Sequence, residues 1–552
     1  MALLLPITYA AAGLTEPLWL DELHSSWVLS GRWEEVAPRA AMGNQTSLYF
    51  FALWILTGLT GQSEVALRMP SLIAWWVALV LAVHCILAAT YLPSLSSGAA
   101  KKEGPLLRKG VTAAVCQHAF FWPTLAVLGW MGLDRIQVFY STEARPYAMV
   151  QLVVLVGWYL LWSAWRLGNL PLSAAGGGGR PDVRLARLAL GGCVCCGLAV
   201  WLHLASVPVV AIQLAAWGWL SLRRPVPPAL LPAGVLFLGV LLMGAIAWDV
   251  RGLAVEVWAR RRQWNAFAGD TALGHLVSIF PFLPWIGAVG AGYAVSISAM
   301  IARQLCGDRP AMPRPPLEYR FAAAFWGVAW LAPLVVYWGL TAAGVAPLLH
   351  SRYLLPIELP LAIFSIILWL HLPTSWLRTT VFLGGLVGML ATQGTLNIWA
   401  DGYVLGWQRG EDWRAASRLI SRQWRAGDRL SCWAGLLEGE TESVPVDGLM
   451  RAYLSFPLRG MYQVRPATAP QGVDPIPLVG GAADWRRQWE AEGAVPGRMW
   501  IVFRGPRRML DEQVERLERI CAPRWAVVPR SPAQPMGRIS VIVLDVGPFE
   551  ES

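Results

Sequence analysis

The sequence predicts a polytopic α-helical membrane protein that ends in a small α/β domain. Of its 552 residues, 56% are hydrophobic and 14% are charged, whereas a soluble globular domain has about 25% charged residues. Apolar runs of about 20 residues, the length that crosses a bilayer, recur as far as residue 398. From about residue 400 the composition becomes polar and mixed. We therefore predict a membrane domain at 1–399 and a second domain at 400–552.

The membrane domain is predicted to hold about eleven transmembrane helices. The first lies within residues 1–14, which are short for a span but lack the basic start and cleavage site of a signal peptide. Residues 15–69 form a first outward loop, in which the apolar stretch Ser47–Leu59 is expected to be an interfacial helix. The ten further spans are expected at about 70–91, 111–133, 146–165, 186–202, 206–222, 229–248, 276–302, 321–343, 353–371 and 379–398.

Basic residues in the short loops predict the orientation of these spans. Lys or Arg follows the second, fourth, sixth, eighth and tenth spans, for example at Arg166, Arg223 and Arg303. With eleven spans these loops share one side, which is therefore cytoplasmic, and the tail faces outward. The net charge of +10 thus sets topology, and it is not gathered on one soluble face as in nucleic-acid-binding proteins.

The tail has the pattern of a small α/β domain. Residues Asp412–Arg425 and Leu510–Ile520 are predicted helices, and Met499–Phe503 and Ile539–Leu544 are predicted strands. No glycine-rich phosphate-binding motif is present in the sequence. Cys432 and Cys521 either remain thiols or form one disulfide if the tail is extracytoplasmic.

Charged residues gather in the loops that are predicted to face outward. The first loop begins with Asp21 and Glu22, and charge at a membrane boundary is costly unless it is used. Glu143 and Arg145, Arg260, and Arg352 lie in the second, third and fourth of these loops. Arginines suit the binding of a phosphate, and a carboxylate can take the proton of an acceptor hydroxyl. The alternatives are a helix cap at Asp21–Glu22, a local Glu143–Arg145 ion pair and a snorkelling Arg352.

Several motifs in this order resemble one family. They are Leu20-Asp21-Glu22, Ser63–Ser71 (SEVALRMPS), Tyr140–Tyr147 (YSTEARPY), His203, Ser351–Pro356 (SRYLLP) and, in the tail, Asp412–Ala416. The chain resembles the GT-C fold membrane glycosyltransferases of family 39, in the bacterial group related to protein O-mannosyltransferases and aminoarabinose transferases. The resemblance covers about 400 residues well and the tail weakly.

The resemblance implies an inner-membrane enzyme that moves a sugar from a polyprenyl-phosphate donor to an acceptor lipid, polysaccharide or protein on the outer face. The transfer would be inverting, with Asp21 as the base, Glu22 orienting it or the acceptor, and Glu143 as a second acidic residue. Arg145, Arg352 and Arg260 would contact the donor phosphate. The remaining expected site-lining residues are Tyr147, Tyr353, His203 and His24. The acidic pair, the Glu143–Arg145 turn and Arg352 are expected to lie around one chamber.

Two other functions stay open as alternatives. The family usually has His or Lys and two prolines where this chain reads Gly43–Tyr49, so a catalytically inactive scaffold is one alternative. A transporter or flippase for a lipid-linked or anionic substrate is another, although no repeat is evident and the charges sit at span ends. No cofactor is expected and no metal-ligand spacing is present, but the two acidic pairs leave a divalent ion possible.

Overall fold

The computed structural model divides the chain into two compact units. It describes residues 13–90, 121–132, 134–169, 181–222, 239, 244, 246, 250–259, 271–280, 283–306, 317–392, 409–440, 444–446, 448–494, 497–522, 525–530 and 532–548. One unit, the helical unit, consists of Met1–Gly13 and Met69–Gly406, and the other, the mixed unit, of Leu14–Arg68 and Trp407–Ser552. The predicted first outward loop therefore belongs to the same unit as the tail. The predicted boundary at residues 399 and 400 stays a prediction.

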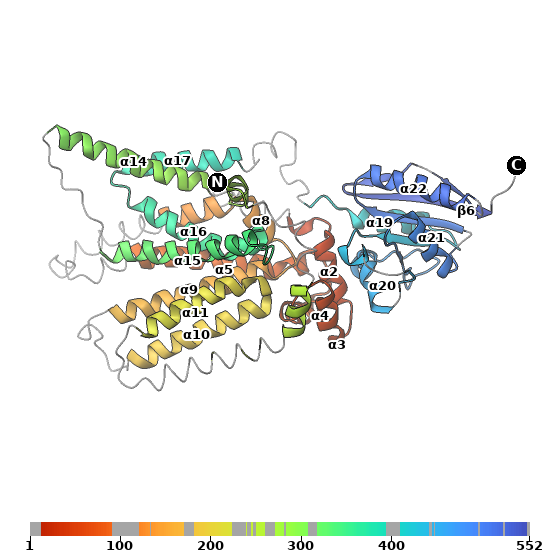
Figure 1. Cartoon of the computed structure of the whole chain (residues 1–552), viewed down its shortest axis with the longest axis horizontal. Helices are drawn as coiled ribbons and strands as arrows, with labels where there is room; N and C mark the ends of the chain where they lie inside the picture. The colour runs from red at the N-terminus through yellow and green to blue at the C-terminus, as the bar shows by residue number, and fades with distance from the viewer. Residues whose placement is uncertain are drawn as a thin grey trace. The chain divides into compact units, whose positions relative to one another are not determined.

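The helical unit is built from long apolar helices (Figure 1). They are α5 (Glu64–Thr90, from Met69 onward), α9 (Tyr147–Asn169), α10 (Pro181–Leu202), α11 (Val207–Leu222), α14 (Leu283–Leu305), α15 (Leu317–Ala342), α16 (Ser351–Leu370) and α17 (Ser375–Thr392). Helix α9 packs against α10 and α16, α15 packs against α16, and α14 packs against α17. Helix α16 is largely buried, because its neighbours cover it on several sides.

Six helices among the described residues are long and apolar enough to cross a membrane: those within α5, α9, α10, α14, α15 and α16. The predicted polytopic class is confirmed, and the count of eleven stays a prediction. Residues 1–12, 111–120 and most of 229–248, where three further spans were expected, lie outside the described residues.

Two predicted helix starts need correction. The span expected at 276–302 is divided into α13 (Leu273–Ile279) and α14, which begins at Leu283. Pro281 and Pro284 stand at this break, and a proline disfavours helical conformation at the residue before it. Helix α5 begins at Glu64, before the expected start at residue 70, because the polar residues Glu64 and Arg68 join the helix without adding to its hydropathy.

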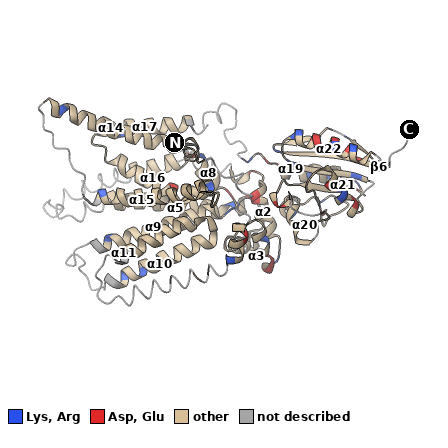
Figure 2. Ribbon diagram, in the orientation of Figure 1, with Lys and Arg blue, Asp and Glu red and all other residues tan. Residues whose placement is uncertain are grey.

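Charged residues occupy the ends of the long helices and are rare along their lengths (Figure 2). Arg166 and Arg303 lie in the last turns of α9 and α14. Glu358 is an exception, because it lies within α16 and is 4% exposed. Gln137 Nε2 donates a hydrogen bond to its carboxylate.

The tail part of the mixed unit is organised by a mixed β-sheet with the strand order β2-β1-β3-β6-β4, in which β5 also pairs with β6. The strands are β1 (Arg429–Trp433), β2 (Ile476–Pro477), β3 (Gly497–Arg504), β4 (Trp525–Pro529), β5 (Gln534–Met536) and β6 (Ile539–Pro548). Strand β1 runs parallel to β2 and β3, whereas β6 is antiparallel to β3, β4 and β5. The predicted strands lie within β3 and β6.

Helices α21 (Ala482–Ala491) and α22 (Arg507–Cys521) share a hydrophobic core with the sheet. Alternate residues of β3, namely Met499, Ile501 and Phe503, point into this core, as strand geometry requires. Helix α19 (Trp413–Gln423) packs on β5 and β6. Cys432 and Cys521 are buried free thiols, so the disulfide left open by the sequence is not formed.

The mixed unit also contains α20 (Gly448–Leu454) and, before α5, three short helices: α2 (Leu20–Leu29), α3 (Trp33–Met42) and α4 (Leu48–Thr60). Helix α2 packs against α3, α4 and the short turns at Phe456–Leu458 and Gly460–Tyr462. Helix α4 confirms the helix expected at Ser47–Leu59, and its side chains Ile55 and Leu59 are 53% and 83% exposed. Its place at a membrane interface stays a prediction.

We predict that Ile501→Ala lowers the free energy of unfolding of the mixed unit by about 2–5 kcal/mol, because it leaves a cavity in the core. Ile501 is 0% exposed on the central strand. Urea unfolding of the full chain in detergent, followed by the reactivity of the Cys432 and Cys521 thiols, measures this change. Val528→Ala is the control, since Val528 is 55% exposed on β4. Equal unfolding curves for the two variants would contradict the assigned core.

Candidate functional site

A small pocket in the helical unit lies where three helical elements begin. They are α9 at Tyr147, the short 3-10 helix η3 (Leu204–Ser206) and α16 at Ser351. The pocket is lined by Tyr147, Val150, His203, Ala205, Ser206, Arg352, Tyr353 and Pro356. Four of the predicted site residues, Tyr147, His203, Arg352 and Tyr353, therefore lie together.

His203 is a neutral group in this pocket. It caps η3, and its Nδ1 accepts a hydrogen bond from the Ala205 N–H at 3.1 Å, which leaves the proton of the neutral ring on Nε2. Burial lowers the pKa of His203 to about 3, and the charges of Arg352 and Arg145 act in the same direction. The ring lies 5.2 Å from that of Tyr147 and 5.6 Å from that of Tyr353 between centroids. His203 can therefore donate a hydrogen bond near neutral pH but does not carry a charge.

Arg352 supplies the positive charge of the pocket wall. It lies in the first turn of α16, where its N–H donates to Nδ1 of the capping residue His350 at 3.3 Å. Its guanidinium carbon lies 4.9 Å from the centroid of the Tyr353 ring. Stacking on an aromatic face orients a guanidinium for the planar recognition of anions such as phosphate.

The turn that precedes α9 carries Glu143 and Arg145. Their side chains are 0% and 5% exposed. The Arg145 N–H donates to the Glu143 carbonyl at 2.8 Å, and the Ser71 hydroxyl donates to the Arg145 carbonyl at 3.0 Å. Helix α8 (Arg135–Ser141), which leads into this turn, lies beside the pocket: the Tyr140 ring lies 5.3 Å from the Tyr147 ring, and the Tyr140 hydroxyl lies 3.3 Å from that of Ser351.

Ser206 is a pocket residue that the sequence analysis missed. Ser206 is 2% exposed, and its hydroxyl has no hydrogen-bond partner among the described residues. An unsatisfied buried hydroxyl costs about 1–3 kcal/mol. A serine three positions after His203 in an apolar run gave no signal, because its role depends on the 3-10 turn that directs it to the pocket.

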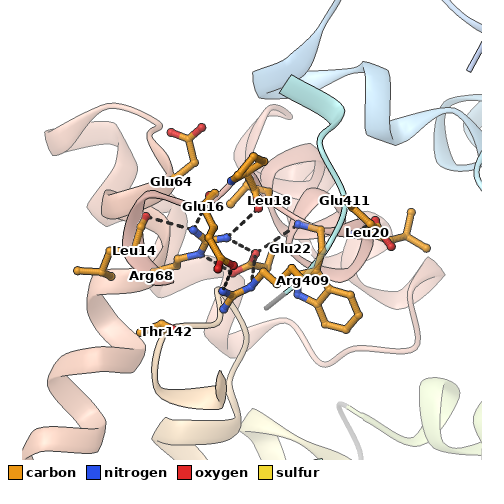
Figure 3. A network of polar contacts seen from close by, with 12 residues as sticks. Leu14, Glu16, Leu18, Leu20, Glu22, Glu64, Arg68, Thr142, Arg409 and Glu411 are labelled. Atoms are coloured by element: carbon orange, nitrogen blue, oxygen red, sulfur yellow. Dashed lines mark hydrogen bonds and ion pairs between the residues drawn. The ribbon is translucent and has the colours of Figure 1, made fainter. Parts of the chain in front are cut away.

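The acidic pair Asp21–Glu22 lies in the mixed unit, in the first turn of α2. Asp21 is partly exposed, whereas Glu22 is fully buried. Figure 3 shows Glu22 between two arginines. Arg68 Nε donates to Glu22 Oε1 at 2.7 Å, and Arg409 Nε lies 3.2 Å from Glu22 Oε2. Glu22 is therefore part of a buried network of ion pairs. The expectation that Asp21 and Glu22 lie around the same chamber as the pocket residues stays a prediction.

His24 is packed among aromatic side chains of the mixed unit. Its ring centroid lies 5.7–6.1 Å from those of Trp27, Phe50, Tyr453 and Phe456. Its Nε2 lies 3.1 Å from the Arg39 carbonyl oxygen. A Cβ at Gly43 would lie 2.5 Å from the ring, so the unusual Gly43 stretch allows this packing. These contacts give His24 a structural role, and the site-lining role expected for it stays a prediction.

Arg260 lies outside the described residues. Among the residues that are described, no group of three or more His, Cys, Asp or Glu side chains is arranged to hold a metal ion.

Comparison with known proteins identifies the fold. No family model and no curated protein matches the sequence. The crystal structure of ArnT from Cupriavidus metallidurans bound to undecaprenyl phosphate matches with a TM-score of 0.50 and 12% sequence identity, over 98% of this chain and 96% of that chain. The apo ArnT structure gives a TM-score of 0.49, 12% identity and coverages of 97% and 96%. The predicted GT-C fold class is thus confirmed, and this chain shares the fold of ArnT.

Proposed function

We propose that this protein is a membrane glycosyltransferase that moves a sugar from a polyprenyl-phosphate donor to an acceptor hydroxyl. The observation that carries the proposal is the pocket at the starts of η3 and α16, which combines Arg352 with His203, Ser206 and two tyrosines. The ArnT structure with the same fold holds undecaprenyl phosphate. The acceptor is a lipid, a polysaccharide or a protein on the outer face, as the sequence resemblance suggests.

The pocket chemistry suits the phosphate of such a donor. Arg352 and Arg145 supply positive charge, and charge-assisted hydrogen bonds to phosphate are stronger than neutral ones. His203 Nε2–H and the Ser206 hydroxyl supply neutral donors. The rings of Tyr147 and Tyr353 bound the space beside them. The site thus stabilises the phosphate before and after it leaves the sugar.

The transfer step is proposed to be inverting, as the sequence resemblance implies. Asp21 takes the proton of the acceptor hydroxyl, and the acceptor oxygen forms a bond to the anomeric carbon. The bond from that carbon to the phosphate oxygen breaks, and the lipid phosphate leaves with the electron pair. Glu22 orients Asp21, and Glu143 is a second acidic group of the site.

The proposal is tested with purified protein in lipid nanodiscs and a panel of radiolabelled undecaprenyl-phosphate sugars. Release of undecaprenyl phosphate, with the label in a lipid, polysaccharide or protein product, or in free sugar where water serves as the acceptor, is the expected result. Movement of the intact donor across proteoliposomes without loss of sugar would instead support a flippase. No turnover and no movement would support an inactive scaffold.

Asp21→Asn is predicted to lower the transfer rate by at least about 100-fold, because a positioned general base contributes about 100- to 10,000-fold. The matched control is Asp511→Asn, which removes a half-exposed carboxylate from α22. Initial rates with the donor that turns over measure the effect. Wild-type rates in Asp21→Asn would exclude Asp21 as the base.

Arg352→Gln is predicted to weaken undecaprenyl phosphate binding by about 10- to 100-fold, because a hydrogen bond to a charged group contributes about 1.5–3 kcal/mol. Ser206→Ala removes a neutral donor and is expected to weaken binding by about 2- to 10-fold. Isothermal titration in detergent measures both effects. The control is Arg303→Gln, at the exposed end of α14, which should bind undecaprenyl phosphate as the wild type does. Equal affinities for all three variants and the wild type would contradict the assignment of the phosphate to this pocket.

A further inference from the structure

The backbone that leads into α2 has its polar partners on the tail. The Leu20 N–H donates to Glu411 Oε2 at 3.0 Å, and the Leu18 N–H donates to the Tyr462 hydroxyl at 3.0 Å. Only the Trp19 N–H between them finds its acceptor locally, at Glu22 Oε2 (3.4 Å). The first N–H groups of a helix have no partner within the helix, so Glu411 completes the start of α2.

The same turn is held by alternating buried charges (Figure 3). Arg409 Nη1 lies 2.9 Å from Glu16 Oε2, and Arg409 Nε lies 3.2 Å from Glu22 Oε2. The side chain of Arg409 is 1% exposed, and those of Glu16 and Glu22 are 5% and 0% exposed. One tail arginine therefore bridges two acids that flank the approach to α2.

Two further pairs close this network on either side. Arg68 pairs with Glu22 and also donates to the carbonyls of Leu14, Glu16 and Pro17 at 3.1, 2.7 and 3.3 Å. Arg504 Nε, on β3, lies 2.7 Å from Glu411 Oε1. Three acids thus face three arginines. Removal of one partner from a buried pair leaves an uncompensated charge, so the structure around the remaining partners must shift.

We propose that Arg409 and Glu411 are positioning residues for Asp21. Asp21 lies between Leu20, whose N–H is bound by Glu411, and Glu22, whose carboxylate is bound by Arg409. The tail therefore fixes the turn that presents this carboxylate, and it contributes to sugar transfer without contacting the donor or the acceptor. This inference rests on the proposed function for the role of Asp21, but the placement of the turn can be tested without it.

The first measurement reports the position of the turn without any turnover. Asp21→Cys is introduced into the full chain in nanodiscs, and the rate of N-ethylmaleimide modification at position 21 is read by peptide mass spectrometry. A second change, Arg409→Gln, is expected to raise this rate at least fivefold. Cys432 and Cys521, which are buried in the mixed unit, should stay protected in the same sample.

Matched variants separate this effect from unfolding. Arg530→Gln removes an exposed arginine that pairs with Asp545 on the same sheet, and it should leave the rate at position 21 unchanged. If Arg409→Gln also exposes Cys432 and Cys521, Glu16→Gln replaces it, because this variant removes one acceptor of Arg409 and keeps Glu22. An unchanged rate at position 21 in whichever variant keeps the two thiols protected would overturn the proposal.

The second measurement uses the donor that turns over. Arg409→Gln is expected to lower kcat at least tenfold with a donor KM within threefold of wild type, and Arg409→Lys should recover part of kcat. A change in KM alone, or full activity in Arg409→Gln, would overturn the positioning role. If the wild-type protein transfers no sugar, the proposed function fails. The modification rates at position 21 then decide alone whether Arg409 holds the first turn of α2 in place.

Discussion

The mixed unit depends on the neutralisation of buried charge. Glu22 is fully buried and contacts two arginines, one from the start of α5 and one from the tail. An isolated buried carboxylate would be very costly, so these segments, which are far apart in the sequence, must come together for the chain to fold. This constraint explains why residues 14–68 belong to the same compact unit as the tail.

In the helical unit, the pocket lies where charged residues are found, at the ends of the long helices. Most charged residues of the long helices lie at their ends, and Arg352 is such a residue, in the first turn of α16. A terminal arginine can snorkel to water, but here the guanidinium stacks on Tyr353 beside His203. The pocket is therefore built from three helix starts, where polar groups are available without breaking an apolar helix.

Much of this could be predicted from the sequence because apolar length and charge position are local signals. They indicated the polytopic class, the helix at Ser47–Leu59 and a candidate site arginine at Arg352, whereas Tyr147, His203 and Tyr353 were expected as site residues only from the family resemblance. Ser206, Arg409 and Glu411 could not be found in this way, because their roles arise from a 3-10 turn and from pairs more than 380 residues apart. The aromatic surroundings of His24 could not be predicted either, because they bring together side chains that are far apart in the sequence, and its expected site-lining role stays a prediction.

If the protein acts as proposed, the uncharged state of His203 affects how the pocket holds the lipid phosphate after the sugar has left. An imidazole whose pKa is lowered to about 3 does not protonate the departing phosphate, and the guanidinium charge of Arg352 faces that phosphate instead. Loss of the sugar gives the lipid phosphate one more ionisable oxygen, which strengthens its attraction to that charge. Under the proposed function, the pocket therefore attracts the lipid phosphate more strongly after the sugar has left than before.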